Sequence, residues 1–248
     1  MKYLLSTIDP DAHMTAEKYG LELEIAEYCT AWNLDDKLAE TDPAVREKLT
    51  HAEAAVLHGP FNELFPCAID PMVRNIARIR YRQALNMAQS YGITRVVIHG
   101  GYNPRLYYPI WYTEQSVEFW KEFIREVPEH MTILLENVME EEIPMFLTIL
   151  EQVGDKRLRM CLDVGHVNAY SKIPVDRWLE DWAPYLSHFH VHNNDGTADQ
   201  HRQLTDGTIP MKALLRKIDT LCPEATITLE LMEPASSVEW MREMELWN

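Results

Sequence analysis

The chain is poor in cysteine. Its 248 residues contain four cysteines (Cys29, Cys67, Cys161 and Cys222), which lie far apart and form no Cys-X-X-Cys pair. So few thiols in a chain of this length argue against a disulfide framework, and the spacing of a zinc finger is absent. We therefore expect reduced, buried thiols in a cytoplasmic protein.

Basic residues are scarce relative to acidic ones. The chain has 23 Lys and Arg against 39 Asp and Glu, which gives a formal net charge of −16 at pH 7. This charge repels polyanions and argues against broad electrostatic binding to nucleic acid or to anionic membranes. A small-molecule substrate fits the composition better.

Long apolar runs, low-complexity tracts and flexible linkers are also missing. Nowhere do 18 apolar residues follow one another, so we expect no membrane span. The apolar run at residues 1–5 is too short for the core of a signal peptide, which again favours the cytoplasm. Because no shift in composition marks a boundary, residues 1–248 are predicted to form one domain.

The chain does contain a regular alternation of short β-type runs and longer helical stretches. This pattern predicts a parallel sheet covered by helices. Eight units of about 31 residues suffice to close a barrel, so we predict an α/β fold, a (β/α)8 TIM barrel, with an open α/β sheet as the alternative. The expected strands are residues 3–7, 21–26, 55–58, 95–99, 132–136, 159–163, 187–192 and 226–231, and the expected helices include 73–91, 114–127, 143–153, 211–221 and 236–246.

Arginines recur every four residues along the helix expected at 73–91. Arg74, Arg78 and Arg82 share one face, with Arg80 nearby. In a barrel this helix lies in the outer ring, so we interpret the stripe as a solvated face or as a subunit contact in a homo-oligomer.

The ends of the expected strands carry the chemistry. The C-terminal ends of parallel barrel strands all face one mouth, where unpaired carboxylates and imidazoles would repel one another or lose hydration. A divalent cation removes that conflict, and nitrogen and oxygen ligands without a thiolate suit Mn, Mg, Fe, Co or Zn. Six strands end on or next to such a group: His58, His99, Glu136, Asp163, His192 and Glu230.

Three further candidates lie close in sequence to these strand ends. His166 follows Asp163 by three residues, and Asp199 and His201 lie in the loop after the seventh strand. In that strand, His190 precedes His192 by two residues, so both side chains share one face and His190 lies one layer deeper. The joint pattern predicts a metal site at the mouth.

With these residues in place, the chain resembles the xylose isomerase-like barrel superfamily, which contains sugar (phosphate) isomerases and epimerases and the apurinic endonuclease type. The resemblance runs from about residue 56 to the C-terminus. The segments that carry it, in this order, are 57–61 (LHGPF), 98–101 (IHGG), 135–137 (LEN), 161–166 (CLDVGH), 190–196 (HVHNNDG), 199–201 (DQH) and 229–230 (LE).

The two branches of the superfamily imply different metal sites. Similarity to the isomerase branch implies one ion bound by Glu136, Asp163, His192 and Glu230, with His166 contacting the substrate. Similarity to the endonuclease branch implies three zinc ions held by all of these residues together with four more. The additional ligands in that case are His58, His99, Asp199 and His201.

Our leading hypothesis is a metal-dependent sugar or sugar-phosphate isomerase or epimerase that uses one to three ions of Mn, Zn, Mg or Co. Glu136 and Glu230 would remove and return the proton next to the substrate carbonyl, through an enediolate, while His166 holds a hydroxyl. The alternative is a multi-zinc phosphoesterase or endonuclease-like hydrolase, for which the acidic charge makes a nucleic-acid substrate unfavourable. A metal-bearing barrel without turnover is the third hypothesis.

Substrate specificity is expected in the aromatic loop after the fourth strand. Tyr102 and Trp111 could stack on a sugar, and Arg105 could pair with a phosphate. Alternatively, these rings pack the loop onto a neighbouring loop or subunit. Trp32 after the second strand and His190 complete the expected substrate contacts, together with Glu24, which either binds a hydroxyl or is a buried ion-pair partner.

Overall fold

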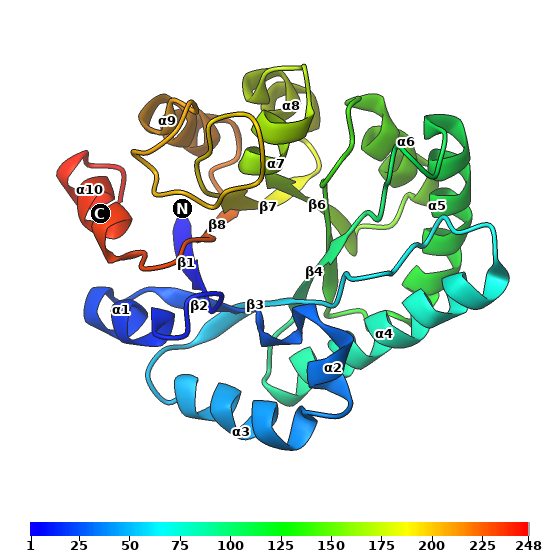
Figure 1. Cartoon of the computed structure of the whole chain (residues 1–248), viewed down its shortest axis with the longest axis horizontal. Helices are drawn as coiled ribbons and strands as arrows, with labels where there is room; N and C mark the ends of the chain where they lie inside the picture. Colours follow the sequence, from blue (N-terminus) through cyan, green and yellow to red (C-terminus); the bar gives the residue numbers. More distant parts are fainter. Residues whose placement is uncertain (248) are drawn as a thin grey trace.

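The computed structural model describes residues 1–247, in which eight parallel strands close into a barrel surrounded by helices (Figure 1). Closure occurs where β1 pairs with both β2 and β8, for instance through Leu5, which lies opposite Leu23 on one side and Leu229 on the other. The strands are β1 (Lys2–Ser6), β2 (Glu22–Ile25), β3 (Ala54–His58), β4 (Arg95–His99), β5 (Thr132–Glu136), β6 (Leu158–Asp163), β7 (Leu186–Val191) and β8 (Thr226–Leu229). The predicted (β/α)8 TIM barrel is confirmed.

The helices form the outer ring seen in Figure 1. The longest, α4, begins at Pro71 because Asp70 caps it by accepting a hydrogen bond from the Met72 amide at 2.7 Å. The helices are α1 (Ala12–Tyr19), α2 (Ala31–Leu34), α3 (Leu38–Lys48), α4 (Pro71–Ser90), α5 (Pro109–Phe123), α6 (Pro144–Val153), α7 (Val164–Tyr170), α8 (Val175–Trp182), α9 (Met211–Leu221) and α10 (Ala235–Glu243), with 3-10 turns η1 (Glu27–Cys29) and η2 (Ile124–Glu126).

Successive side chains of each strand point alternately outward and inward, which produces two cores. Side chains that point outward form one large apolar cluster with the helices. Inside the barrel, β1, β3, β4, β5 and β6 contribute a small apolar cluster of Leu4, Val56, Val97, Leu134 and Cys161. By contrast, β2, β7 and β8 contribute buried charged and hydroxyl side chains that hydrogen-bond to one another.

Two sequence expectations shift in the structure. The helix expected at 114–127 begins earlier, at Pro109, whose fixed φ angle suits a first helical position, and its last turn is the 3-10 turn η2. The arginine stripe on α4 is not simply a solvated face. Arg78 lies 2.5 Å from Glu122 and Arg82 lies 2.6 Å from Glu126, so both pair with the next helix of the ring.

No helix within residues 1–247 is both long enough and apolar enough to cross a membrane.

Candidate metal centre at the barrel mouth

All nine predicted ligands meet at the C-terminal end of the barrel. Four of them are the last residues of their strands, and His192 and Glu230 directly follow β7 and β8. The mouth opens into a cavity of about 510 Å³. Its walls include His58, His99, Glu136, His166, Asp199, His201 and Glu230.

The first group of ligands is built around Glu136. Its Oε2 atom lies 3.3 Å from His58 Nε2 and 3.2 Å from His99 Nε2. The His58 Nδ1 atom donates a hydrogen bond to the Gly59 carbonyl at 2.9 Å, which leaves Nε2, beside the carboxylate, as the nitrogen that can bind a metal. Two nitrogens and one oxygen therefore face a common point.

A second group joins Asp163 and His192. The Asp163 Oδ1 atom lies 3.3 Å from His192 Nε2, and the same oxygen accepts a hydrogen bond from the His166 amide at 2.6 Å. Asp163 thus ends β6, caps α7 and faces the mouth at once. Glu230 borders this group, with ligand atoms of Glu230, His192 and His201 within 4.8 Å of one another.

Asp199 is the centre of the third group. Its Oδ2 atom lies 3.2 Å from His166 Nε2 and 3.1 Å from His201 Nε2. Both rings are oriented by their other nitrogen: Nδ1 of His166 donates to the Asn137 carbonyl at 2.8 Å, and Nδ1 of His201 donates to the Glu230 carbonyl at 2.9 Å. Backbone acceptors of this kind commonly fix the orientation of metal-ligating histidines.

Several of these ligand atoms are buried without a hydrogen-bond partner among the described residues. They are Glu136 Oε2, Asp163 Oδ2, His192 Nδ1 and Nε2, and Asp199 Oδ1. Leaving buried polar atoms unsatisfied costs free energy, and a cation would supply the missing interactions. The donor set, all oxygen and imidazole nitrogen, therefore fits divalent metal ions.

Protonated histidines balance the buried carboxylates at the mouth. Burial would raise the pKa of Glu136, but His99 and His190 lower it well below its ordinary value. Burial opposes protonation of His166, yet Asp163 and Asp199 raise its pKa to about 10. The same balance raises the pKa of His201 to about 9, through Asp199 and Glu230. Metal binding at these rings must release protons.

Beneath the mouth, Glu24 is the centre of a buried hydrogen-bond network. Its carboxylate lies 2.9 Å from His190 Nε2 and 2.9 Å from His188 Nε2, and it accepts a hydrogen bond from the Thr228 hydroxyl at 2.5 Å. His190 Nδ1 in turn lies 3.2 Å from Glu136 Oε1. Of its two expected roles, Glu24 therefore takes that of a buried ion-pair partner, and His190 lies below the cavity wall.

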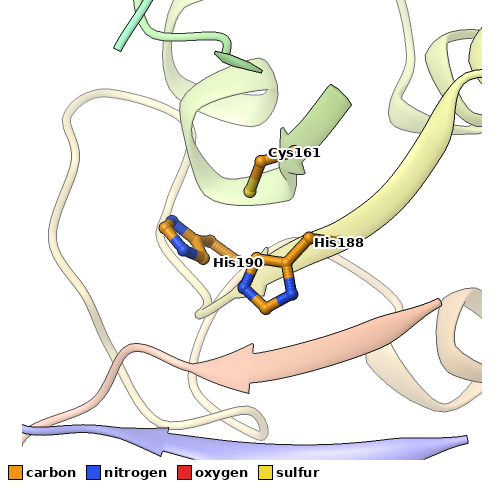
Figure 2. A group of neighbouring side chains, drawn as sticks. All are labelled: Cys161, His188 and His190. Atoms are coloured by element: carbon orange, nitrogen blue, oxygen red, sulfur yellow. The ribbon is translucent and has the colours of Figure 1, made fainter. Parts of the chain in front are cut away.

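Figure 2 shows Cys161 of β6 beside His188 and His190 of β7, all directed into the barrel interior. The three residues are close enough to share a metal ion. However, both nitrogens of each ring already have a partner, including the Thr226 hydroxyl at 2.6 Å from His188 Nδ1. We therefore interpret this cluster as a hydrogen-bonded support for the mouth.

The structure places some of the expected substrate contacts in the cavity wall and others outside it. Tyr102 lines the cavity, whereas Trp32, Arg105 and Trp111 do not. Trp32 is 66% exposed and donates to Asp36 at 3.0 Å, and Arg105 is exposed. Trp111, in the first turn of α5, donates to the Cys67 carbonyl at 2.9 Å, so it packs against a neighbouring loop, in line with the alternative interpretation.

Other cavity residues were not predicted. Phe61 stacks on His99 with ring centroids 4.3 Å apart, and Leu64, Met139 and Tyr170 form further parts of the wall. Phe61 had a sequence signal, since it follows the strand-ending His58 by three residues within one of the quoted motifs. Leu64 and Met139 lie in loops whose path the sequence did not indicate, and Tyr170 is the last residue of α7.

The fold and this mouth define a (β/α)8 barrel with a cluster of potential metal ligands at its C-terminal end. The chain belongs to the xylose isomerase-like TIM barrel family, whose pattern matches residues 16–245. The resemblance drawn from the motifs is confirmed.

Individual relatives are distant. An uncharacterized protein of Methanocaldococcus jannaschii, MJ1311, is 24% identical over 198 residues, which cover 71% of this chain and 63% of that protein. This chain thus spans less than two thirds of that relative's length.

Among solved structures, a D-tagatose 3-epimerase-like protein aligns with a TM-score of 0.82 at 22% identity, covering 99% of this chain and 97% of the other. A Thermus thermophilus protein, TTHB071, soaked with ZnCl2, gives 0.78 at 24% identity, covering 98% of both chains. A D-psicose 3-epimerase with D-tagatose from Clostridium cellulolyticum H10 gives 0.72 at 16%, covering 100% and 90%. At this identity the likeness shows the shared fold.

Proposed function

We propose that the protein is a divalent-metal-dependent isomerase or epimerase of a sugar or sugar phosphate. One observation carries the proposal: Glu136 and Glu230 both line a cavity of about 510 Å³, a size that suits a small molecule. Both carboxylates also approach the same ring, since His190 Nδ1 lies 3.2 Å from Glu136 and 3.5 Å from Glu230. The sugar epimerases among the similar structures support this substrate class.

In this proposal Glu136, Asp163, His192 and Glu230 hold the ion. A divalent cation there supplies Lewis acidity to the oxygens of an open-chain sugar. Glu136 and Glu230 remove and return the proton on the carbon next to the carbonyl, which changes a configuration or moves the carbonyl. His166 holds a substrate hydroxyl, and Phe61 and its neighbours exclude water from the cavity.

The proposal predicts that Glu136→Gln and Glu230→Gln abolish turnover of ketoses or their phosphates without unfolding the barrel. Gln keeps the shape of Glu but cannot accept a proton. The measurement is epimer or isomer formation, with deuterium uptake from D2O at the carbon next to the carbonyl, in parallel with metal content and a circular dichroism melt. Glu114→Gln, at an exposed position of α5, is the matched control and should behave like the parent protein.

If either variant retains its metal and still shows near-normal turnover or isotope uptake, the replaced glutamate is not the base. Absence of isotope uptake by the parent protein on every ketose and ketose phosphate tested would overturn the proton-transfer reaction itself.

A second candidate function rests on the other five ligands. His58 and His99 complete a group around Glu136, and His166 and His201 complete one around Asp199. A one-ion isomerase has no need of two extra groups, whereas a phosphoesterase uses two or three ions to activate water and to stabilise the leaving oxygen. Metal analysis separates the candidates when combined with assays of phosphodiesters and phosphomonoesters. Three ions and phosphate release support hydrolysis, and one ion with isotope uptake supports isomerisation.

The choice of Mn, Zn, Mg or Co, the cytoplasmic location and the homo-oligomer stay predictions. A small sugar remains the expected partner, and nucleic acid is disfavoured by the net charge of −16.

A further inference from the structure

A second cluster of histidines lies on the outer wall of the barrel, away from the mouth. His13 belongs to α1, Glu47 to the last turn of α3, and His51 to the turn that leads from α3 to β3. Each of the three offers a ligand atom within 4.8 Å of the other two. Their ring centroids place His13 and His51 only 5.1 Å apart, tilted by 54°.

Hydrogen bonds determine which nitrogen of each ring is free. His13 Nδ1 lies 3.2 Å from the Pro10 carbonyl, and His51 Nδ1 lies 2.9 Å from Glu17 Oε2. A carbonyl and a carboxylate accept hydrogen bonds, so Nδ1 is the donor in both rings. Each neutral ring therefore carries its lone pair on Nε2, the atom that can bind a metal.

Glu47 supplies an oxygen at the same place. Its Oε1 atom lies 3.7 Å from His51 Nε2, and the two residues are four apart in sequence, as are His13 and Glu17. The backbone holds this turn in place, since the His51 amide donates to the Lys48 carbonyl at 3.0 Å. Two imidazoles and one carboxylate are thus presented together by two neighbouring segments.

We propose that His13, His51 and Glu47 form a zinc site, with water as the fourth ligand. Two histidines, a glutamate and a water form a common tetrahedral zinc environment. Glu17 and the Pro10 carbonyl supply the outer hydrogen bonds that typically orient zinc-bound histidines. The ion would link α1 to the connection between α3 and β3. Because the ligands meet only in the folded chain, zinc would stabilise the barrel independently of the reaction at the mouth.

Zinc itself is the probe, and the purified full chain is the sample. The parent protein, His51→Ala and Glu47→Gln are freed of metal and titrated with ZnCl2 while zinc content and melting temperature are measured. His51 and Glu47 are accessible at the surface, so their replacement spares the core. His130→Ala, an exposed histidine elsewhere, is the matched control.

Both site variants should bind one zinc ion fewer than the parent protein and the control. They should also lose the part of the zinc-dependent rise in melting temperature that this ion contributes. Glu17→Gln should keep the ion but weaken its affinity by about 10- to 100-fold, as is usual when an outer hydrogen bond is removed. Anomalous scattering from zinc between α1 and α3 would locate the ion directly.

Equal zinc content and equal melting shifts in the parent protein, His51→Ala and Glu47→Gln would overturn the site. So would anomalous scattering confined to the mouth at a zinc concentration that saturates the parent protein. Neither result would bear on the proposed isomerase activity, because none of these residues lines the cavity.

Discussion

At the scale of single residues, a carboxylate buried inside the barrel is a feature whose burial costs free energy. Glu24 has no exposed surface, and an isolated carboxylate in this position would be strongly destabilising. His188, His190 and Thr228 make hydrogen bonds to its two oxygens. Burial alone would raise the pKa of Glu24, but the two histidines lower it well below its ordinary value. Glu24 thereby orients His190 toward Glu136.

Glu24→Gln should therefore destabilise the barrel and loosen the mouth. The amide places N–H donors against ring N–H donors, and breaking a buried charge pair typically costs about 3 to 5 kcal/mol. We expect a loss of about that size in urea unfolding, together with weaker metal binding at the mouth. Thr228→Val removes one hydrogen bond of the same carboxylate and should cost only about 1 kcal/mol. Equal stability of Glu24→Gln and the parent protein would contradict this role.

A second buried carboxylate, Glu140, titrates near neutrality. It accepts hydrogen bonds from the Tyr112 hydroxyl at 3.1 Å and from the Val138 amide at 2.6 Å. Burial raises the pKa of Glu140 to about 7, above its ordinary value of 4.5, and these hydrogen bonds only partly oppose the rise.

The contribution of Glu140 to stability should therefore fall as pH rises from about 4.5 to 7. In this interval the folded chain binds the Glu140 proton more tightly than the unfolded chain does, so Glu140 disfavours folding by up to about 3 kcal/mol above pH 7. Glu140→Gln should gain stability over the parent protein at pH 8 and lose most of that gain by pH 5, as measured by urea unfolding. Glu142→Gln, at an exposed position, should show no such trend. A stability difference that is the same at both pH values would refute the assignment.

At the scale of elements, the junction of β6 and α7 shapes the second ligand group. Asp163 ends the strand and caps the helix, and Gly165 in the first helical turn lies directly against the His192 ring. A Cβ atom at Gly165 would overlap that ring. Glycine is needed here for the close approach of the helix backbone to a ligand side chain.

Gly165→Ala should therefore displace His192 although it changes no ligand. We expect a loss of metal affinity and turnover of about 100-fold, because errors of about 1 Å in a catalytic site have effects of this order. Val167→Ala, which removes buried atoms from the same helix, should lower stability and leave metal affinity unchanged. Isothermal titration with Mn²⁺ compares the variants. Unchanged affinity in Gly165→Ala would contradict the need for glycine beside the His192 ring.

At the scale of the whole molecule, the candidate ligands of the mouth come from all the strands from β3 to β8 or from the segments that follow them. An ion bound there ties together parts of the chain that separate on unfolding. It therefore favours the folded barrel by mass action, by about 2.7 kcal/mol when its concentration is 100 times its dissociation constant.

Chelation should lower the melting temperature by about 5 to 10 °C, since each kcal/mol corresponds to about 2 to 4 °C in a chain of this size. Calorimetry with and without EDTA measures the shift, and added Mn²⁺ or Zn²⁺ should restore it. The experiment is best done in His51→Ala, which removes any contribution from the outer wall. A melting temperature that does not respond to EDTA in this variant would mean that no ion links the strands.

Much of this architecture follows from local sequence. The expected strands agree with the observed ones within two residues at each end, because alternating apolar runs and intervening helical stretches have distinct periods. The nine predicted ligands lie together for a related reason, since parallel topology brings strand ends to one mouth. Trp32, Arg105 and Trp111 were assigned to the substrate on residue type alone, and loop paths depend on contacts that are distant in sequence.

The amino-acid sequence by itself determined the barrel, the acidic charge and the choice of nine candidate ligands, because each depends on periodicity, composition or strand order. Only the tertiary structure decided how those ligands divide into groups around Glu136, Asp163 and Asp199. It alone placed Glu24 beneath them and paired Arg78 and Arg82 of α4 with Glu122 of α5 and Glu126 of η2. It also brought His13 of α1 beside His51, a pairing between residues far apart in sequence. Such contacts depend on how whole elements pack against one another, and a local sequence pattern does not predict this packing.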